Sequence, residues 1–325
     1  MAEDLPHHLP ELLVLGPPLC FQICDKDFSS RFRILRSWES PLPLHQFLRA
    51  EAQATQVALC SGLFSFSADV LRDLPSLRLL LTSSAGVNNV DLVECSRRGV
   101  EVANAAGIYS ADVADFAVGL LLDVLRKISA GNRFVKNGLW SKQGAYPLGS
   151  KLGGKRVGIV GLGSIGNEIA KRLKPFGCSI SYSSRNKKLS VPYVFYSDVC
   201  KLAAASDILI ICCALTEETH HLINREVMLS LGKGGIIINI ARGAVVDEKE
   251  LVNCLKRGDI SGAGLDVFEN EPLVPEELCE LDNVVLTPHC AVFTKESPRE
   301  VFELVCKNIE AFYSHRPLLS SVFAD

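Results

Sequence analysis

Three side chains of complementary chemistry, Arg242, Glu271 and His289, each come shortly after an apolar run in the second half of the sequence. If those runs are strands of one parallel sheet, their carboxyl ends share the edge at which ligands bind in open α/β sheets. An imidazole can protonate a nascent alkoxide, a carboxylate can tune that imidazole, and a guanidinium can orient an anionic substrate. Together the three residues suit the reduction of a carbonyl group by a hydride donor.

A glycine-rich turn indicates what that hydride donor is. Gly161-Leu-Gly-Ser-Ile-Gly166 follows the predicted strand Lys155–Val160 and opens a predicted helix. In a dinucleotide-binding turn, the first glycine makes the tight turn, the second lets the backbone approach pyrophosphate, and the third allows close helix packing. The helix N-terminus then presents free amides to the phosphates. A simple glycine turn is the alternative, but we expect cofactor contacts from Gly161, Leu162, Gly163, Ser164, Ile165 and Gly166.

The turn after the next strand indicates which dinucleotide is preferred. An NAD enzyme would place Asp or Glu about 20 residues on, where it binds the ribose 2′-hydroxyl. Here the strand Ser179–Tyr182 runs into Ser183-Ser-Arg-Asn-Lys-Lys188, which contains no carboxylate. Ser184 and Arg185, with Asn186 or Lys187, would instead surround a 2′-phosphate, which guanidinium binds through charge-assisted hydrogen bonds. The sequence predicts NADPH over NADH; a solvated basic turn is the alternative.

The elements that position these residues alternate between short apolar runs and longer amphipathic stretches, as in parallel sheets covered by helices. Strands are expected at Leu12–Leu15, Gln56–Cys60, Leu77–Thr82, Lys155–Val160, Ser179–Tyr182, Asp207–Cys213, Gly235–Ile240, Ile260–Leu265 and Val284–Leu286. A largely buried helix over Asp112–Ile128 would join two domains, a loop or arm is expected at Asn137–Lys155, and the final helix Ser297–Ser314 should pack on the first domain. The predicted fold class is α/β, with two doubly wound parallel-sheet (Rossmann/flavodoxin-like) domains and a cleft between them.

Composition narrows the function classes. The 325 residues carry 34 basic and 37 acidic side chains, a net charge of −3, and no Lys/Arg block, which argues against nucleic acid or an anionic membrane as partner. No apolar run approaches the ~20 residues needed to cross a bilayer. The first residues lack signal-peptide character and the last are not a peroxisomal address, so a cytoplasmic location is expected. The 12 cysteines lack zinc-ligand spacing, so no metal is expected, and Cys212–Cys213 are expected to be buried in a strand.

Longer segments resemble a known family. The stretches NIARGAVVDEKEL, GAGLDVFENEP and NVVLTPH are similar to signature blocks of the D-isomer-specific 2-hydroxyacid dehydrogenases. The resemblance extends from SSAGVNNVDL through DVADFAVGLLL and KRVGIVGLGSIG to the C-terminal helix. The chain is particularly similar to the plant glyoxylate/hydroxypyruvate and hydroxyphenylpyruvate reductases, whose cofactor turn also reads Ser-Arg.

This resemblance implies roles for individual residues. His289 would donate the proton to the C2 oxygen, Glu271 would hydrogen-bond its imidazole and favour its protonated form, and Arg242 would bind the carboxylate and carbonyl of the substrate. Asp266 would bind the nicotinamide carboxamide, with a helix cap as the alternative, and Glu269 is the alternative partner of His289. The cofactor would also be lined by Ile240, Ala241, Arg242, His289 and Ala291, and the substrate carboxylate held by amides of Ala85, Gly86 and Val87.

The resemblance also implies an organisation and a reaction. Residues 1–101 with 290–325 would form the substrate domain, and residues 102–289 the NAD(P)-binding domain. The arm around Trp140 would build a homodimer. The expected reaction is NADPH-dependent reduction of 2-oxo acids (glyoxylate, hydroxypyruvate, possibly 4-hydroxyphenylpyruvate) to D-2-hydroxy acids. An NAD-linked phosphoglycerate dehydrogenase and a non-catalytic, dinucleotide-sensing corepressor are the alternatives. Cys290-Ala-Val-Phe293 is bulkier than the usual small residues of relatives and leaves side-chain preference open.

Overall fold

The computed structural model describes residues 9–323, which form two compact units. The first unit comprises the described residues up to Tyr109 and from Thr294 onward, and the second is Ser110–Phe293. The first unit therefore ends at Tyr109 and resumes at Thr294, whereas the family resemblance implies a first domain that ends at residue 101 and resumes at residue 290. The chain ends on which the expected location depended, residues 1–8 and 324–325, lie outside the described residues. Within residues 9–323, no helix has both the length and the apolar character that crossing a membrane requires.

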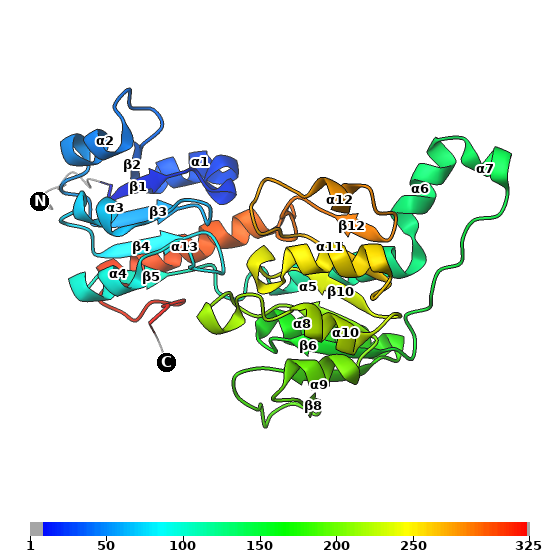
Figure 1. Cartoon of the computed structure of the whole chain (residues 1–325). Coiled ribbons are helices and arrows are strands. Elements are labelled where there is room, and N and C mark those ends of the chain that lie inside the picture. Colours follow the sequence, from blue (N-terminus) through cyan, green and yellow to red (C-terminus); the bar gives the residue numbers. More distant parts are fainter. Residues whose placement is uncertain (1–8, 324–325) are drawn as a thin grey trace, which may run out of the picture. The chain divides into compact units, whose positions relative to one another are not determined.

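The first unit is built on a five-stranded parallel sheet in the order β2-β1-β3-β4-β5 (Figure 1). This is the flavodoxin-like order. Its strands are β1 Glu11–Leu15, β2 Arg33–Arg36, β3 Val57–Cys60, β4 Leu79–Thr82 and β5 Glu101–Ala103. Its helices are α1 Leu19–Arg31, α2 Leu44–Glu51, α3 Ala68–Arg72, α4 Leu92–Arg98 and α13 Ser297–Tyr313. β3 and β4 are buried at every position, because helices cover both faces of the sheet.

The last helix packs on the first sheet although it follows the second unit in sequence. α13 shares a core with α1, in which the ring of Phe302 meets Phe28 edge-on at 4.7 Å between centroids. Val301, Val305 and Ile309 bury the same face of α13. This is the packing that the sequence predicts for the final helix.

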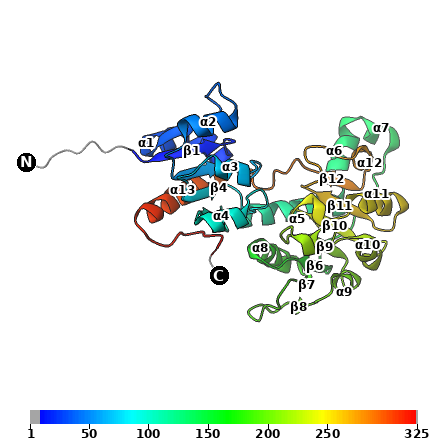
Figure 2. The ribbon, with the colours of Figure 1, turned by 60° about the vertical axis from the view of Figure 1, so that its left-hand side comes forward.

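The second unit contains a seven-stranded parallel sheet in the order β12-β11-β10-β9-β6-β7-β8 (Figure 2). The strands are β6 Arg156–Val160, β7 Ser179–Ser183, β8 Val194–Phe195, β9 Ile208–Ile211, β10 Ile236–Asn239, β11 Gly262–Leu265 and β12 Val284–Leu286. The helices are α5 Ser110–Arg126, α6 Ile128–Lys136, α7 Leu139–Gln143, α8 Ser164–Leu173, α9 Val199–Ala204, α10 Arg225–Leu231, α11 Glu248–Arg257 and α12 Glu276–Cys279, with 3-10 turns at Lys174–Phe176, Glu217–Thr219 and Gly243–Val245. The strand order reverses between β6 and β9, the position at which doubly wound sheets bind ligands.

Parts of the fold differ from the sequence-based expectations. The expected loop at 137–155 begins with a short helix, α7, which contains Trp140. The following segment is held to α6 by Tyr146, whose hydroxyl donates to Lys127 O at 3.0 Å and whose ring contacts Phe134. The strands β2, β5 and β8 were not expected, because they are short edge or near-edge strands without a continuous apolar run.

Candidate active site

The glycine turn after β6 has the geometry of a dinucleotide site. Gly161 has a φ of +99°, and a Cβ there would lie 2.6 Å from the backbone nitrogen of Cys213. A Cβ on Gly166 would lie 2.4 Å from Gly161 O, so only glycine allows α8 to pack this closely. Gly163, at the N-cap of α8, has nothing within 4 Å of its Cβ position. The first and third glycines therefore shape the turn, while the second leaves open space where a phosphate can approach.

The paired cysteines follow β9 and pack against this glycine turn, which corrects the expectation that they lie in a strand. β9 ends at Ile211, so Cys212 and Cys213 come after it and are only half-buried. The Cys212 thiol donates to Gly161 O at 3.0 Å. Burial raises the pKa of Cys213 to about 11, so this thiol stays protonated. The apolar run continues beyond the end of β9 because its last residues, Cys212 and Cys213, pack against the glycine turn.

The turn after β7 carries no acidic residue, as the sequence predicts. Ser184 Oγ donates to Asn186 O at 2.7 Å, which fixes a tight turn. The side chain of Arg185 is exposed there. Its positive charge also reaches Glu218, where it adds to the larger effect of the Thr216 hydroxyl in lowering the carboxyl pKa.

Arg242 lies just past the end of β10, at the start of the 3-10 turn Gly243–Val245. Asn239 shapes this bend, since its Oδ1 accepts from Ala241 N and its Nδ2 donates to Arg242 O, both at 3.1 Å. The guanidinium donates to Ala241 O at 2.6 Å and pairs with no carboxylate of residues 9–323. Burial lowers the pKa of Arg242, and Glu271 opposes that effect. A partly desolvated cation without an ion-pair partner is well suited to bind a small anion.

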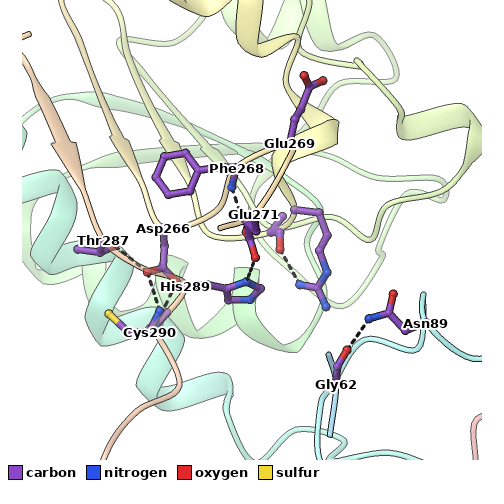
Figure 3. Close-up of polar contacts among 12 residues, drawn as sticks. Gly62, Asn89, Asp266, Phe268, Glu269, Glu271, Thr287, His289 and Cys290 are labelled. Carbon is purple, nitrogen blue, oxygen red and sulfur yellow. Dashed lines mark hydrogen bonds and ion pairs between the residues drawn. The ribbon is translucent and has the colours of Figure 1, made fainter. Parts of the chain in front are cut away.

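His289 and Glu271 form a hydrogen-bonded pair at 2.7 Å between Nδ1 and Oε2 (Figure 3). The other carboxylate oxygen, Oε1, accepts from Phe268 N at 3.0 Å, so the carboxylate is fixed in orientation. Because Nδ1 faces Glu271, the imidazole Nε2 is the atom left for a substrate. The His–carboxylate arrangement is that of a general acid whose tautomer is set by its partner.

Asp266 organises the loop that carries His289. The carboxylate accepts hydrogen bonds from Thr287 Oγ1 at 2.6 Å, Cys290 N at 2.9 Å and Ala291 N at 3.0 Å (Figure 3). Its main-chain oxygen accepts from His289 N at 2.8 Å. Asp266 is 1% exposed, so these bonds replace its lost hydration. These contacts show that Asp266 holds the loop of His289 in place, a role that the sequence alone did not suggest for this residue.

Glu269, the alternative partner of His289, points elsewhere. Its carboxylate pairs with His221 Nε2, and Figure 3 shows it directed away from His289. Its amide donates to Glu248 Oε2 at 3.2 Å, and burial raises the pKa of Glu248. The chain between Asp266 and Glu271 is thereby tied to the segment that begins α11. The structure brings Glu271, not Glu269, to the imidazole.

In the first unit, the predicted substrate-binding residues Ala85, Gly86 and Val87 form a loop after β4. Neighbouring asparagines hold this region through hydrogen bonds from their side-chain amides to main-chain oxygens. Asn89 Nδ2 donates to Gly62 O at 2.6 Å (Figure 3), and Asn104 Nδ2 donates to Ala85 O at 2.6 Å. Sequence reasoning missed Asn104, Asn239 and Thr287, because a polar residue at a strand end is also common in ordinary turns.

A family model, related sequences and solved structures all indicate the same family. Residues 118–291 match the family described as "D-isomer specific 2-hydroxyacid dehydrogenase, NAD binding domain". The chain is 50% identical over 317 residues to glyoxylate/hydroxypyruvate reductase HPR3 of Arabidopsis thaliana, covering 97% of this chain and 98% of that protein. It is 44% identical to hydroxyphenylpyruvate reductase of Plectranthus scutellarioides, covering 92% and 95% of the two chains.

A solved structure is similar over the same length. The NADPH-dependent glyoxylate/hydroxypyruvate reductase of Sinorhizobium meliloti, in complex with NADP and malonate, superimposes with a TM-score of 0.89 at 33% identity, covering 97% of each chain. The family match over residues 118–291 spans the glycine turn and the segments that carry Arg242, Glu271 and His289. The chain therefore belongs to the D-isomer-specific 2-hydroxyacid dehydrogenase family and has its NAD(P)-binding domain.

Proposed function

We propose that the protein is an NADPH-dependent reductase that converts 2-oxo acids into D-2-hydroxy acids. Glyoxylate and hydroxypyruvate are the first candidate substrates, and 4-hydroxyphenylpyruvate is the third. The observation that carries the proposal is the His289–Glu271 pair at 2.7 Å, in the same unit as the partly buried Arg242, which makes no ion pair within residues 9–323. The names of the plant relatives, which are reductases of these acids, support the same substrate class.

The residues have distinct roles in this reaction. Arg242 binds the substrate carboxylate and polarises the neighbouring carbonyl group. His289 donates a proton from Nε2 to the carbonyl oxygen as negative charge develops there, while Glu271 stabilises the protonated imidazole through Nδ1. Bound NADPH supplies the hydride that the carbonyl carbon accepts. The amides of Ala85, Gly86 and Val87 also hold the carboxylate.

Two turns of the second unit suit the pyrophosphate and the 2′-phosphate of NADPH. The open space at Gly163 and the N-terminus of α8 accommodate pyrophosphate, with contacts from Gly161 to Gly166. Ser184, Arg185 and Asn186 bind the 2′-phosphate, since a guanidinium replaces the acidic residue that would bind a ribose 2′-hydroxyl. The remaining cofactor contacts are assigned to Ile240, Ala241, Arg242, Asp266, His289 and Ala291.

The active form is proposed to be a homodimer built by the arm of α6 and α7. The structure gives α6 no buried residue, and this arm exposes apolar side chains. Val135 on α6 is 54% exposed and Trp140 on α7 is 63% exposed, and large apolar side chains grouped on one segment favour an interface.

The decisive experiment is a panel of 2-oxo acids with NADPH and NADH, ranked by kcat/KM. We expect the highest values for glyoxylate or hydroxypyruvate with NADPH. Preference for NAD with 3-phosphoglycerate would favour a phosphoglycerate dehydrogenase instead. Tight dinucleotide binding without turnover of any 2-oxo acid would favour the corepressor-like alternative.

A further inference from the structure

The main-chain oxygens of residues 83–86, in the loop after β4, all accept hydrogen bonds from within the first unit. The donors are Tyr109 Oη to Ser83 at 2.7 Å, Ala105 N to Ser84 at 2.9 Å, Asn104 Nδ2 to Ala85 at 2.6 Å and Ser84 Oγ to Gly86 at 2.5 Å. A peptide flip in this loop would break at least one of these bonds.

The amides of the same loop are left without partners. Within residues 9–323, the main-chain N–H groups of Ala85, Gly86 and Val87 donate to no other group. Successive unpaired amides form a concave anion-binding site, provided that the peptide planes are held in one orientation. The carbonyl bonds supply that orientation, so the residues that donate them decide whether the amides can receive a carboxylate.

Asn104 is the donor whose side chain is itself fixed at both ends. Its Oδ1 accepts from Ala106 N at 2.9 Å, and its Nδ2 donates to Ala85 O. Ala106 has a φ of +47°, an unfavourable value for a residue with a Cβ, which this bond helps to maintain. Rotation of the Asn104 amide would therefore lose both contacts.

The C-terminal segment fixes the main chain of Asn104. Asn104 N donates to Ser320 O at 3.2 Å, and Ser320 Oγ donates to Asn104 O at 2.8 Å. Ser320 Oγ also accepts from Nδ2 of Asn308 on α13 at 3.0 Å. Asn308 is 1% exposed, and its Oδ1 accepts from Leu319 N at 2.9 Å. Val322 N donates to Val102 O at 2.8 Å, which adds the segment to the edge of β5.

We propose that Asn104 is a positioning residue for the substrate carboxylate, and that Leu319–Val322 holds it in place. The inference rests on the proposed function, because it assumes that the amides of Ala85–Val87 bind the carboxylate of a 2-oxo acid. The chain of bonds runs from Asn308 through Ser320 and Asn104 to the Ala85 carbonyl. It couples the C-terminal segment to substrate affinity and not to hydride transfer.

The first test compares Asn104→Ala with Asn283→Ala. Asn283 is a matched control, since its Nδ2 also donates to a main-chain oxygen, that of Ser261, at 3.1 Å in the second unit. We expect Asn104→Ala to raise the KM for glyoxylate about two- to tenfold, the usual effect of one hydrogen bond, with the KM for NADPH unchanged. Asn283→Ala should leave both KM values near those of the wild type.

The second test separates positioning from a merely structural role. Asn104→Asp keeps the size of the side chain, but at neutral pH its carboxylate cannot donate to Ala85 O and repels the substrate. We expect a larger rise in KM at pH 8 than for Asn104→Ala. A protonated carboxyl can donate to Ala85 O. The ratio of variant to wild-type KM should therefore fall toward one as the pH approaches about 4, the ordinary pKa of an Asp side chain. A purely structural defect would not produce that convergence.

Ser320→Ala tests the same role if the Asn104 variants fail to fold. This change removes the bond to Asn104 O and the acceptor for Asn308, and a smaller rise in the KM for glyoxylate is expected, again with the KM for NADPH unchanged. Unchanged glyoxylate KM in all folded variants, or equal rises for both ligands, would overturn the positioning role alone. A wild-type protein that reduces no 2-oxo acid would overturn the proposed function and the positioning role with it.

Discussion

At the scale of the residue, His289 is held by more than its carboxylate partner. Its φ of +50° lies in the left-handed region, which costs free energy for a residue with a Cβ. The main-chain N–H of His289 donates a hydrogen bond to Asp266 O, and the Asp266 carboxylate accepts three more from the same loop. These hydrogen bonds keep the loop in that conformation. The strained backbone fixes the direction in which the imidazole points, so Asp266 contributes to the geometry of the acid.

Replacement of His289 tests its role as proton donor. We expect His289→Ala to lower kcat about 10²–10⁴-fold, the contribution of general acid catalysis. NADPH affinity should fall far less than kcat, because the phosphate-binding turns at Gly161–Gly166 and Ser184–Asn186 are untouched although one cofactor contact is lost. Steady-state kinetics and NADPH fluorescence titration measure the two quantities, and an unchanged kcat would contradict the assignment.

The two nearby glutamates offer a matched comparison. Glu271→Gln should lower kcat at neutral pH, because the neutral amide no longer stabilises a protonated imidazole. Glu269→Gln should leave kcat near the wild-type value, since Glu269 pairs with His221 instead. Equal losses in the two variants would mean that the Glu271–His289 bond has no special role in turnover.

Cofactor preference is also decided by single side chains. We expect Arg185→Ala to weaken NADPH binding by about 1.5–3 kcal/mol, the usual value for a hydrogen bond to a charged group. NADH has no 2′-phosphate, so its affinity should change little. Binding titrations with both cofactors measure the difference, and equal losses would exclude a 2′-phosphate contact at this residue.

At the scale of the element, the chemistry lies where strands end. The glycine turn follows β6, Arg242 follows β10, and the loops with Glu271 and His289 follow β11 and β12. Parallel strands present their carboxyl ends at one edge, so a short turn after each strand is enough to gather these groups. The register of the strands sets the position of each group. The hydrogen bonds of Asn239 and Asp266 set the directions in which Arg242 and His289 point.

The glycine turn gives a test at this scale. Gly163→Ala meets no protein atom within 4 Å, so the midpoint of thermal unfolding should stay close to that of the wild type. The added methyl group would occupy space that the pyrophosphate requires, so NADPH affinity should fall markedly. Gly234→Ala, equally open and remote from the turn after β6, is the control and should change neither. Normal NADPH binding by Gly163→Ala would contradict the assignment.

At the scale of the whole molecule, two units of related design divide the work that the proposal requires. Each has its own sheet and its own buried core, and each places candidate ligand-binding loops after its strands. α13 returns the chain to the first unit, so that unit is completed only by residues beyond Thr294. Neither α6 nor α7 has a buried residue, and this arm is where the proposed second copy would bind.

Sedimentation tests the proposed dimer. For a chain of 35.4 kDa we expect twice that mass for the wild type, and a shift toward the monomer for Trp140→Asp. The change inserts a charge into the proposed interface, where burial without a partner is costly. Leu189→Asp is the control, because Leu189 is also an exposed apolar residue but lies between β7 and β8. A monomeric wild type would end the dimer proposal.

The amino-acid sequence alone determined the features that depend on local residue types. The strand–glycine turn–helix pattern at Gly161–Gly166, the missing carboxylate after β7 and the two-sheet α/β class are encoded within short segments, so pattern and propensity were sufficient to predict them. Short strands without an apolar run, such as β2, were missed, because their pairing partners rather than their own residues make them strands.

Only the tertiary structure decided which polar groups meet. Glu269 and Glu271 are nearly equivalent in sequence, and the fold directs one to His221 and the other to His289. The bond between Ser320 and Asn104 joins residues 216 positions apart, and no local pattern predicts such a contact. Hydrogen bonds depend on distances of about 3 Å and on direction, and these are set by the packing of distant elements.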